Sequence, residues 1–283
     1  HECNYKCPHC VIGTKSEVDE FYEGEYLDFE SFKYIVDQGS EYNCPSLSPQ
    51  GNNEPFLIKD LHKYILYASK KGFIDIMLNN NGSALTPKRS QQILDSGLTR
   101  LRFSLDAMSQ ETYSKVRVGS IPIDRVKRNI ETFLNLKEKG GYKLPIVGVS
   151  FCRLKQNQEE ENEFIEYWYN KVDIISIQQF VPPTPNVNKY EKFYTDDQYI
   201  ESPKDKFNCV QPYQRLVIKN QLIYPCCVTF NKNLVLGSIN KTKIHDAWHS
   251  PKMNELREIH KLGDYKKDKT CKTCVDLIYP TRN

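Results

Sequence analysis

The chain has 283 residues, of which 39% are hydrophobic and 27% are charged, as in ordinary soluble globular proteins. Its net charge of +3 is too small to indicate electrostatic binding to nucleic acid or to a membrane surface. No apolar run approaches the ~18 residues that cross a bilayer, and no signal peptide is visible. We therefore expect a cytoplasmic protein with one large domain, or one domain and an appendage.

Strand-like and helix-like patterns alternate from residue 28 to about residue 183. Helical spacing of apolar residues predicts helices at 28–42, 58–71, 86–97, 109–116, 122–139 and 158–170. Extended patterns predict five strands, at 45–50, 73–82, 100–107, 145–154 and 173–183. This alternation predicts a parallel sheet, which tends to carry its functional residues at the C-terminal ends of the strands.

The character of the chain changes after residue 183. Residues 184–205 are polar, rich in tyrosine and without periodicity, which predicts a linker. Residues 215–227 read as a β-hairpin that turns at 219–221, residues 243–263 as one helix, and a final CKTC closes a small cysteine-bearing module.

Ten cysteines are the most informative feature of the composition. Two are isolated, Cys44 and Cys152, and we read them as buried small hydrophobic residues. The others form an N-terminal group (Cys3, Cys7, Cys10) and a C-terminal group (Cys209, Cys226, Cys227, Cys271, Cys274). Disulfide frameworks belong mostly to small secreted chains, so metal binding is the better interpretation of both groups.

The N-terminal group has the spacing C-x3-C-x2-C on one short segment, HECNYKCPHC. Three thiolates are one short of a tetrahedral zinc site, which His1 or His9 could complete. The alternative is a [4Fe–4S] cluster, in which each corner prefers a cysteine thiolate. With three cysteines, one iron has no protein ligand and is open to a substrate or cofactor.

The segment CNYKCPHC resembles the C-x3-C-x-aromatic-C motif of radical S-adenosylmethionine (SAM) enzymes, with His9 in the aromatic position. In that family the open iron chelates the amino and carboxylate groups of SAM, and reductive cleavage yields a 5′-deoxyadenosyl radical. The resemblance implies that Cys3, Cys7 and Cys10 hold the SAM-binding cluster and that His9 lies against the cofactor.

Two further segments carry the same resemblance. GNNEP (51–55) is similar to the family's GGEP-like turn, with Asn52 and Asn53 in place of the two glycines, and implies that Glu54 binds the amino group of SAM. FSLDAMSQETYSKVRVG (103–119) resembles the fourth-strand segment, and implies that Ser104 and Arg117 bind polar groups of the cofactor. Asp106 either caps the following helix or contacts substrate.

The resemblance runs in order through residues 1–183 and implies an α/β fold, a partial (β/α)6 TIM-like barrel. In this family a strand precedes the cysteine motif. We therefore expect a first strand before residue 1, and expect the natural protein to begin upstream of this sequence.

The C-terminal group lies in a region, 206–283, that resembles the SPASM or twitch modules appended to many radical SAM enzymes. The resemblance implies a small α+β module holding one auxiliary [4Fe–4S] cluster, with Cys209, Cys226, Cys271 and Cys274 as its ligands. Gln221 stands where the family has a glycine five residues before the hairpin cysteine, which leaves Cys226 and Cys227 as alternatives. The spare cysteine, taken as Cys227, is either inert packing or a hydrogen-atom donor to a substrate radical.

These resemblances imply an enzyme that uses two [4Fe–4S] clusters and SAM to abstract a hydrogen atom from its substrate. An electron donor such as flavodoxin or ferredoxin is the implied partner. Oxidation or epimerisation of a sugar or aminocyclitol-like small molecule is the first hypothesis, and radical modification of a ribosomally made peptide is the second. A non-catalytic zinc-binding protein is the alternative from another class.

Overall fold

The computed structural model describes residues 3–13, 27–184, 187–198, 205–229 and 231–279. The chain divides into two compact units. The first contains residues 1–17 and 43–180, and the second contains residues 18–42 and 181–283. No helix in the described residues is long and apolar enough to cross a membrane.

The first unit is built on a five-stranded parallel sheet in the order β1-β2-β3-β4-β5. Its strands are β1 (Ser46–Leu47), β2 (Asp75–Asn80), β3 (Arg100–Ser104), β4 (Ile146–Arg153) and β5 (Ile174–Gln179). The connecting helices are α3 (Leu61–Lys70), α4 (Pro87–Leu94), α5 (Gln110–Val116), α6 (Ile123–Lys139) and α7 (Glu161–Trp168). A parallel sheet in chain order with helical crossovers is the predicted α/β partial barrel. The strand expected before residue 1 stays a prediction.

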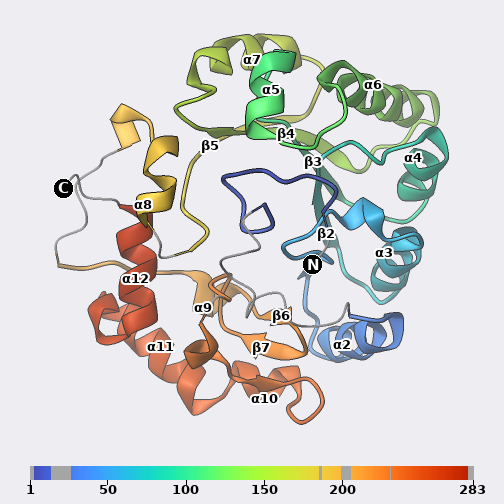
Figure 1. Ribbon diagram of the computed structural model, residues 1–283. Coiled ribbons are helices and arrows are strands. Elements are labelled where there is room, and N and C mark those ends of the chain that lie inside the picture. Colours follow the sequence, from blue (N-terminus) through green and yellow to red (C-terminus); the bar gives the residue numbers. More distant parts are fainter. Residues whose placement is uncertain (1–2, 14–26, 185–186, 199–204, 230, 280–283) are drawn as a thin grey trace. The chain divides into compact units, whose positions relative to one another are not determined.

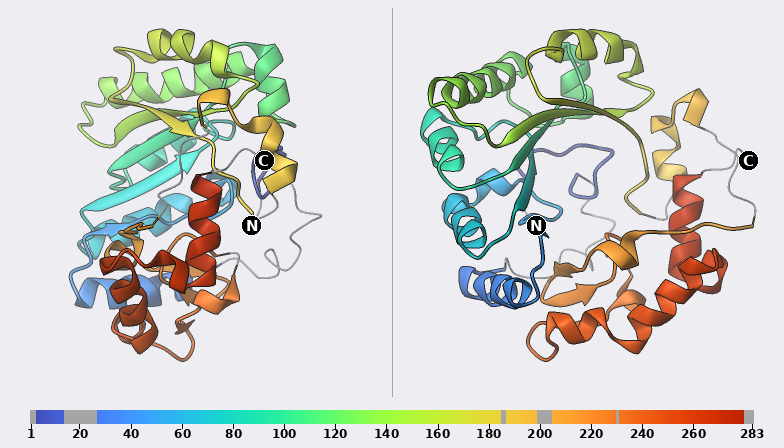
Figure 2. Two further views of the ribbon diagram at one scale, coloured as in Figure 1. Left: turned by 90° about the vertical axis from the view of Figure 1, so that its left-hand side faces the viewer. Right: turned by 180° about the vertical axis from the view of Figure 1, so that it is seen from behind.

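Helices cover one face of this sheet, and alternation along the strands places the apolar side chains on that face (Figures 1 and 2). Phe103 of β3 meets Phe133 of α6 with ring centroids 6.2 Å apart. Phe151 of β4 meets Phe164 of α7 at 5.0 Å. These four rings are fully buried, so the hydrophobic core of the unit lies between the sheet and its helices.

The opposite face of the sheet carries the alternate residues, and most of them are polar. Asn79 lies beside Arg102, and Ser104 beside Ser150, because the strands pair in that register. Residues 3–13, drawn in dark blue, run past the strands on this face (Figure 1). The first unit therefore has an apolar face packed on helices and a polar face turned toward the cysteine loop.

The second unit contains a three-stranded antiparallel sheet of β6 (Val217–Lys219), β7 (Leu222–Tyr224) and β8 (Gly237–Ser238). Its helices are α2 (Phe29–Glu41), α8 (Val187–Tyr190), α9 (Gln211–Gln214), α10 (Ile244–Trp248), α11 (Pro251–Lys261) and α12 (Lys269–Ile278). One small core joins Ile223, Ile239 and Ala247, and Ile35 of α2 packs against it. Helix α2 thus belongs structurally to the second unit, although its sequence precedes the large sheet.

One expectation for the second unit needs correction. Residues 243–263 form two helices rather than one, because Ser250 caps a new helix that has Pro251 in its first turn. The Ser250 side chain accepts a hydrogen bond from the backbone N–H of Met253 at 3.3 Å. The final CKTC lies on helix α12, whose N-cap Asp268 accepts a hydrogen bond from the Cys271 N–H at 2.8 Å.

The interval predicted as a linker has structure in its described part. Helix α8 leads into a 3₁₀ turn at Glu191–Phe193, and a second turn follows at Asp196–Gln198. Tyr190, Phe193 and Tyr194 are buried there. Buried aromatic side chains fix this segment, and they do not follow a helical or strand-like period. The structure of the segment therefore could not be predicted from periodicity.

Candidate functional site

The N-terminal cysteines lie on a tightly turned loop. The N–H of Cys10 donates to the carbonyl of Cys7 at 3.0 Å, and the N–H of Gly13 donates to the carbonyl of Cys10 at 3.0 Å. A Cβ at Gly13 would lie 2.0 Å from the Cys7 carbonyl oxygen, so the turn requires glycine there. Cys7 is buried, while Cys3 and Cys10 are partly exposed. The loop therefore presents three thiols from one compact turn.

Three hydrogen bonds tie this loop to the C-terminal edge of the large sheet. The Asn81 amide, just after β2, donates to the side-chain oxygen of Asn4 at 2.9 Å, and Asn4 donates to the Ser83 hydroxyl at 2.8 Å. The backbone N–H of Lys6 donates to the carbonyl of Val118 at 2.7 Å, beyond the end of α5. The cysteine loop is thus held where parallel α/β folds place their sites.

A buried ion pair lies directly behind the loop. Arg117 Nη2 is 2.6 Å from Asp106 Oδ2, with the two side chains 12% and 1% exposed. Arg117 Nη1 also lies 3.9 Å from the Cys7 sulfur, and His9 Nε2 lies 3.5 Å from Asp106 Oδ2. Burial opposes the charge on both groups, but the attraction between the carboxylate and the guanidinium outweighs this cost. The pKa of Asp106 is lowered and that of Arg117 raised.

Asp106 therefore does not cap the following helix, which was one of its two interpretations. Ser109 is the N-cap of α5, and its hydroxyl accepts a hydrogen bond from the Thr112 N–H at 3.1 Å. Asp106 instead has φ 61, a left-handed conformation that aspartate tolerates better than most residues. Its other oxygen accepts a hydrogen bond from the Cys152 N–H at 2.8 Å, on β4.

Glu54 is placed by the turn that precedes a short 3₁₀ helix, Pro55–Leu57. Its carboxylate is 3% exposed and accepts hydrogen bonds from the Phe56 N–H at 3.0 Å and the Asn81 N–H at 2.7 Å. Burial raises the pKa of Glu54 to about 7, although both backbone donors and the nearby arginines oppose the rise. Because Asn81 also binds Asn4, Glu54 and the cysteine loop share one anchoring residue.

Ser104 ends β3, where its hydroxyl accepts from the Ser150 hydroxyl at 3.4 Å. The structure thus brings Ser104, Glu54, His9 and Arg117 to the same edge of the sheet as the three thiols. Burial raises the pKa of Cys7 to about 11, and Arg117 acts against this. The Arg117 guanidinium, 3.9 Å from the Cys7 sulfur, favours the thiolate form in which a cysteine binds metal.

The arrangement of the thiols distinguishes two kinds of metal site. Within the described residues, no three His, Cys, Asp or Glu side chains converge on a position for a single metal ion. A zinc site needs such convergence. A [4Fe–4S] cluster does not, because each thiolate binds a different iron. The three thiols of the loop fit a [4Fe–4S] cluster with one open iron; His1, which could complete a zinc site, lies outside the described residues.

The C-terminal cysteines also gather, in the second unit. Burial raises the pKa of Cys226 and of Cys274 to about 12, and neighbouring thiols add to both shifts. Burial also raises the pKa of Cys209 and of Cys271, to which thiols of the same group contribute. Cys227 is the one exposed thiol of the described cysteines. The five thiols are therefore close enough to interact, and they come from the β-hairpin end, helix α12 and the segment before α9.

The hairpin explains the departure from glycine at position 221. Asn220 and Gln221 have φ 50 and 62, so both occupy the left-handed region that a two-residue hairpin turn requires. The Gln221 carbonyl accepts a hydrogen bond from the Ile239 N–H at 2.9 Å, and its side chain accepts one from Asn240. Gln221 thus keeps the backbone conformation that favours glycine. The Gln221 side chain adds a contact to the turn after β8.

His260 was not singled out in the sequence, yet it contacts this thiol group. Its ring, 3% exposed, lies between the backbone of Cys209 and the sulfur of Cys271. The sequence carried one signal for it. Met253, Leu256 and His260 follow helical spacing, which places a histidine on the buried face of α11.

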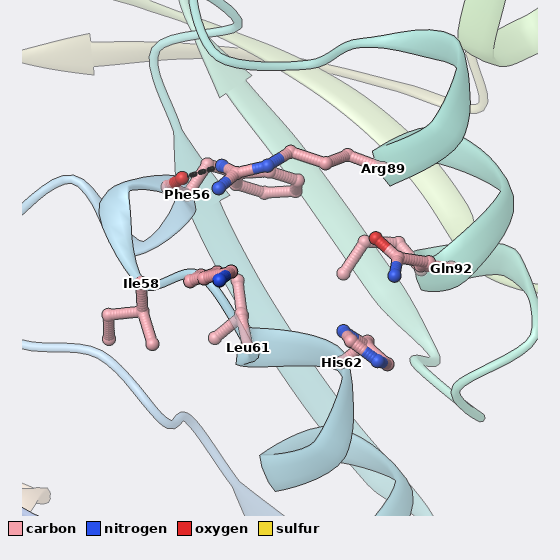
Figure 3. Close-up of a pocket in the computed structure, with 8 residues that line it drawn as sticks. Phe56, Ile58, Leu61, His62, Arg89 and Gln92 are labelled. Carbon is pink, nitrogen blue, oxygen red and sulfur yellow. Dashed lines mark hydrogen bonds between the residues drawn. The ribbon is translucent and has the colours of Figure 1, made fainter.

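A small pocket lies apart from these residues, between the 3₁₀ turn after Glu54 and helices α3 and α4 (Figure 3). Arg89 points from α4 to the carbonyl of Phe56 and hydrogen-bonds to it, and Gln92 of α4 lies between Arg89 and His62 of α3. None of the predicted site residues lines this pocket. Arg89 here stabilises the turn that carries Glu54.

Comparison with known proteins decides the family. The family model described as "Radical SAM superfamily" matches residues 1–167. The chain belongs to this superfamily. A second model, SPASM, described as "Iron-sulfur cluster-binding domain", matches residues 209–275. These matches confirm a radical SAM enzyme with a SPASM-type region, and with it SAM and two [4Fe–4S] clusters as cofactors. The zinc alternative is not retained.

Curated relatives of this radical SAM chain include GTP 3′,8-cyclases. The enzyme of Thermodesulfovibrio yellowstonii is 26% identical over 215 residues, which cover 75% of this chain and 63% of that protein. A probable GTP 3′,8-cyclase of Methanococcus vannielii is 27% identical over 189 residues, which cover 67% of this chain and 59% of that protein. The chain spans about three fifths of the length of these relatives.

Two solved structures share the fold over nearly the whole chain. BtrN in complex with AdoMet and 2-DOIA has a TM-score of 0.59 at 18% identity, covering 100% of this chain and 89% of that one. Native anSMEcpe with bound AdoMet has a TM-score of 0.63 at 16% identity, covering 96% and 85%. The likeness confirms the fold, a parallel α/β unit followed by a small C-terminal module.

Proposed function

We propose that this radical SAM enzyme abstracts a hydrogen atom from a hydroxyl-rich small molecule, such as a sugar or aminocyclitol, and oxidises or epimerises it. When bound, the N-terminal cluster and SAM supply a 5′-deoxyadenosyl radical, and the auxiliary cluster supplies one-electron transfer. A cytoplasmic flavodoxin or ferredoxin is the proposed electron donor. The polar inner face of the large sheet is the observation that carries this choice of substrate.

We propose the following roles for the site residues. Cys3, Cys7 and Cys10 hold the cluster that binds SAM. Glu54, fixed by two backbone N–H groups, accepts a hydrogen bond from the SAM amino group. Arg117 binds the SAM carboxylate, and Asp106 keeps that guanidinium oriented and charged. His9 and Ser104 line the same edge and contact the cofactor's polar groups.

The inner face of the sheet supports a polar substrate. Asn79, Arg102, Ser150, Ser176 and Gln178 alternate on it with few apolar residues. Arg102 stands out, because its Nε donates to the Asn79 amide oxygen at 2.8 Å and has no carboxylate partner in the described part of the chain. Burial lowers the pKa of Arg102. A half-buried guanidinium beside amides and hydroxyls favours an oxygen-rich ligand over an apolar one.

The auxiliary ligands proposed here are Cys209, Cys226, Cys271 and Cys274. The left-handed conformation at Gln221 supports the alignment in which the hairpin cysteine is Cys226, five residues later. Cys226 is also the more buried of the two adjacent cysteines, and Cys227 is exposed. The remaining thiol of Cys227 is then either a surface group or the hydrogen-atom donor that an epimerisation needs.

Deuterium tracing tests the proposed reaction. The anaerobically reconstituted protein is incubated with reductant, SAM and candidate polyols deuterated at their carbinol carbons. The proposal expects deuterium in 5′-deoxyadenosine, together with a ketone or an inverted carbinol. An inverted product that gains a solvent-derived hydrogen indicates epimerisation, and a ketone indicates oxidation. Substrate-independent 5′-deoxyadenosine with every polyol tested would contradict the choice of substrate.

Peptide modification is the second candidate. A structure of anSMEcpe with bound AdoMet and the Kp18Cys peptide has a TM-score of 0.63 and covers 96% of this chain. The same tracing, with peptides deuterated at Cα and Cβ, separates the two candidates. Transfer of deuterium from a peptide but from no polyol would replace the small-molecule proposal with this one.

A further inference from the structure

His260 lies in the last turn of α11 and on its buried face. Its own carbonyl accepts a hydrogen bond from the Asn208 amide at 2.7 Å, which holds the end of the helix against the segment that carries Cys209. The fold therefore fixes the end of α11, and the buried His260 imidazole is held there with it.

The His260 ring has three polar neighbours, which are the Phe207 backbone, the Cys209 N–H and the Cys271 sulfur. Nδ1 is 3.3 Å from the backbone nitrogen of Cys209, which can only donate, so Nδ1 accepts this hydrogen bond and carries no proton. A neutral imidazole with an unprotonated Nδ1 carries its proton on Nε2. Nε2 lies 3.4 Å from the sulfur of Cys271 and thus donates to it. The backbone N–H of Cys209 thus selects the imidazole tautomer that donates to the Cys271 sulfur.

Cys271 needs such a donor, because a carboxylate lies beside it. Asp268 accepts a hydrogen bond from the Cys271 N–H at 2.8 Å. This places the negative charge of the Asp268 carboxylate beside Cys271, where it opposes a second negative charge on the sulfur. Of these groups, the Nε2–H of His260 is the one that stabilises negative charge on this sulfur.

We propose that His260 is a positioning residue of the auxiliary site, which donates a hydrogen bond to the Cys271 thiolate and thereby raises the reduction potential of the auxiliary cluster. The inference rests on the proposed ligand role of Cys271. A hydrogen bond to a cluster sulfur stabilises the reduced state more than the oxidised state, because the reduced state carries one more negative charge. An auxiliary cluster with a raised potential accepts an electron more readily.

Two variants separate the two ring contacts. His260→Asn places an amide oxygen near the position of Nδ1, so it can accept from Cys209 but is too short to reach Cys271. His260→Gln extends one bond further and can donate to the Cys271 sulfur. His249→Gln, at an exposed histidine of the same unit, is the control. All three are made in a Cys7→Ala/Cys10→Ala background, so that only the auxiliary cluster is titrated.

The measurement is a reductive titration followed by electron paramagnetic resonance, with iron and sulfide assayed on each sample. In His260→Asn we expect the ratio of reduced to oxidised cluster at the parent midpoint to fall about tenfold, which is 59 mV for one electron. We expect His260→Gln to recover most of this shift and His249→Gln to show none.

Three results would overturn the inference in distinguishable ways. An unchanged potential in His260→Asn means that the imidazole only packs. Loss of the cluster's iron from both His260 variants, with normal folding, means that His260 is itself a ligand. A parent variant with no cluster at all overturns the ligand assignment of the proposed function, and this inference with it.

Discussion

The buried pair of Asp106 and Arg117 gives the sharpest prediction from the site. The change is Asp106→Asn, which removes the charge and little else. Asparagine tolerates the left-handed φ of 61 at this position. It also keeps an oxygen that can accept from the Cys152 N–H, a bond of 2.8 Å in the native chain. What the variant loses is the ion pair of 2.6 Å with Arg117 and the 3.5 Å contact of the same carboxylate oxygen with His9.

The expected cost follows from burial. Removing one partner of a buried ion pair costs about 3–5 kcal/mol, because the other charge is left without compensation. For a chain of this size a loss of about 4 kcal/mol lowers the melting temperature by roughly 10 °C. The matched control is Asp75→Asn, which breaks a pair with Arg100 at 2.5 Å whose side chains are 36% and 44% exposed. That change is expected to cost under about 1 kcal/mol.

The assay is anaerobic thermal unfolding, followed by circular dichroism, in a double-mutant cycle with Arg117→Met. Removing both charges should be less harmful than the sum of the two single losses, with a coupling energy of about 2 kcal/mol or more. Equal losses of unfolding free energy in Asp106→Asn and Asp75→Asn would show that burial of the Asp106–Arg117 pair adds nothing to its worth. Additive losses in the cycle would contradict the expected coupling.

Three further predictions concern the carboxylate, the inner face and the auxiliary ligands. The pKa of Glu54 is raised to about 7 in the folded chain, so the folded state binds a proton there more tightly than the unfolded state. This contribution to the free energy of unfolding is complete below pH 4.5 and is lost as pH rises through 7. Without SAM, the unfolding free energy of the wild type should therefore fall by about 3 kcal/mol more than that of Glu54→Gln between pH 5 and pH 8; parallel pH profiles would contradict this. Arg102→Met should raise KM for the substrate about tenfold, the worth of a hydrogen bond to a charged group, and leave substrate-free SAM cleavage unchanged. Arg125→Met, at an exposed position on α6, should change neither, and equal effects would rule out substrate contact by Arg102. Cys226→Ala should lose about four irons and Cys227→Ala none, as read by iron and sulfide assay; the reverse result would exchange the two residues.

The sequence was sufficient for the elements of the large sheet. Strands β2, β3, β4 and β5 lie within the predicted ranges, because apolar alternation between helical patterns is a local signal. The break between α10 and α11 was also locally encoded. Ser250 followed by Pro251 is a helix start, but the continuous apolar spacing around it favoured one long helix.

The contacts that define the site could not be obtained in the same way. Asp106 and Arg117 are separated by helix α5, and the choice of Ser109 as its cap freed Asp106 for the ion pair. The pairing of His260 with Cys209 and Cys271 joins three segments that only tertiary structure brings together. The family resemblance gave Glu54 and Arg117 as candidate SAM-binding residues. The structure adds the backbone N–H groups that hold Glu54 and the carboxylate of Asp106 that holds Arg117.

Iron content and SAM cleavage, measured on the same protein, test the assignment of the two clusters. The protein is purified and reconstituted without oxygen, its iron and sulfide are assayed, and 5′-deoxyadenosine is measured after reduction in the presence of SAM. We expect about seven to eight irons per chain, and about four with no 5′-deoxyadenosine in a Cys7→Ala/Cys10→Ala variant. Cleavage of SAM that persists in that variant, or a wild-type protein that binds zinc and no iron, would contradict this assignment.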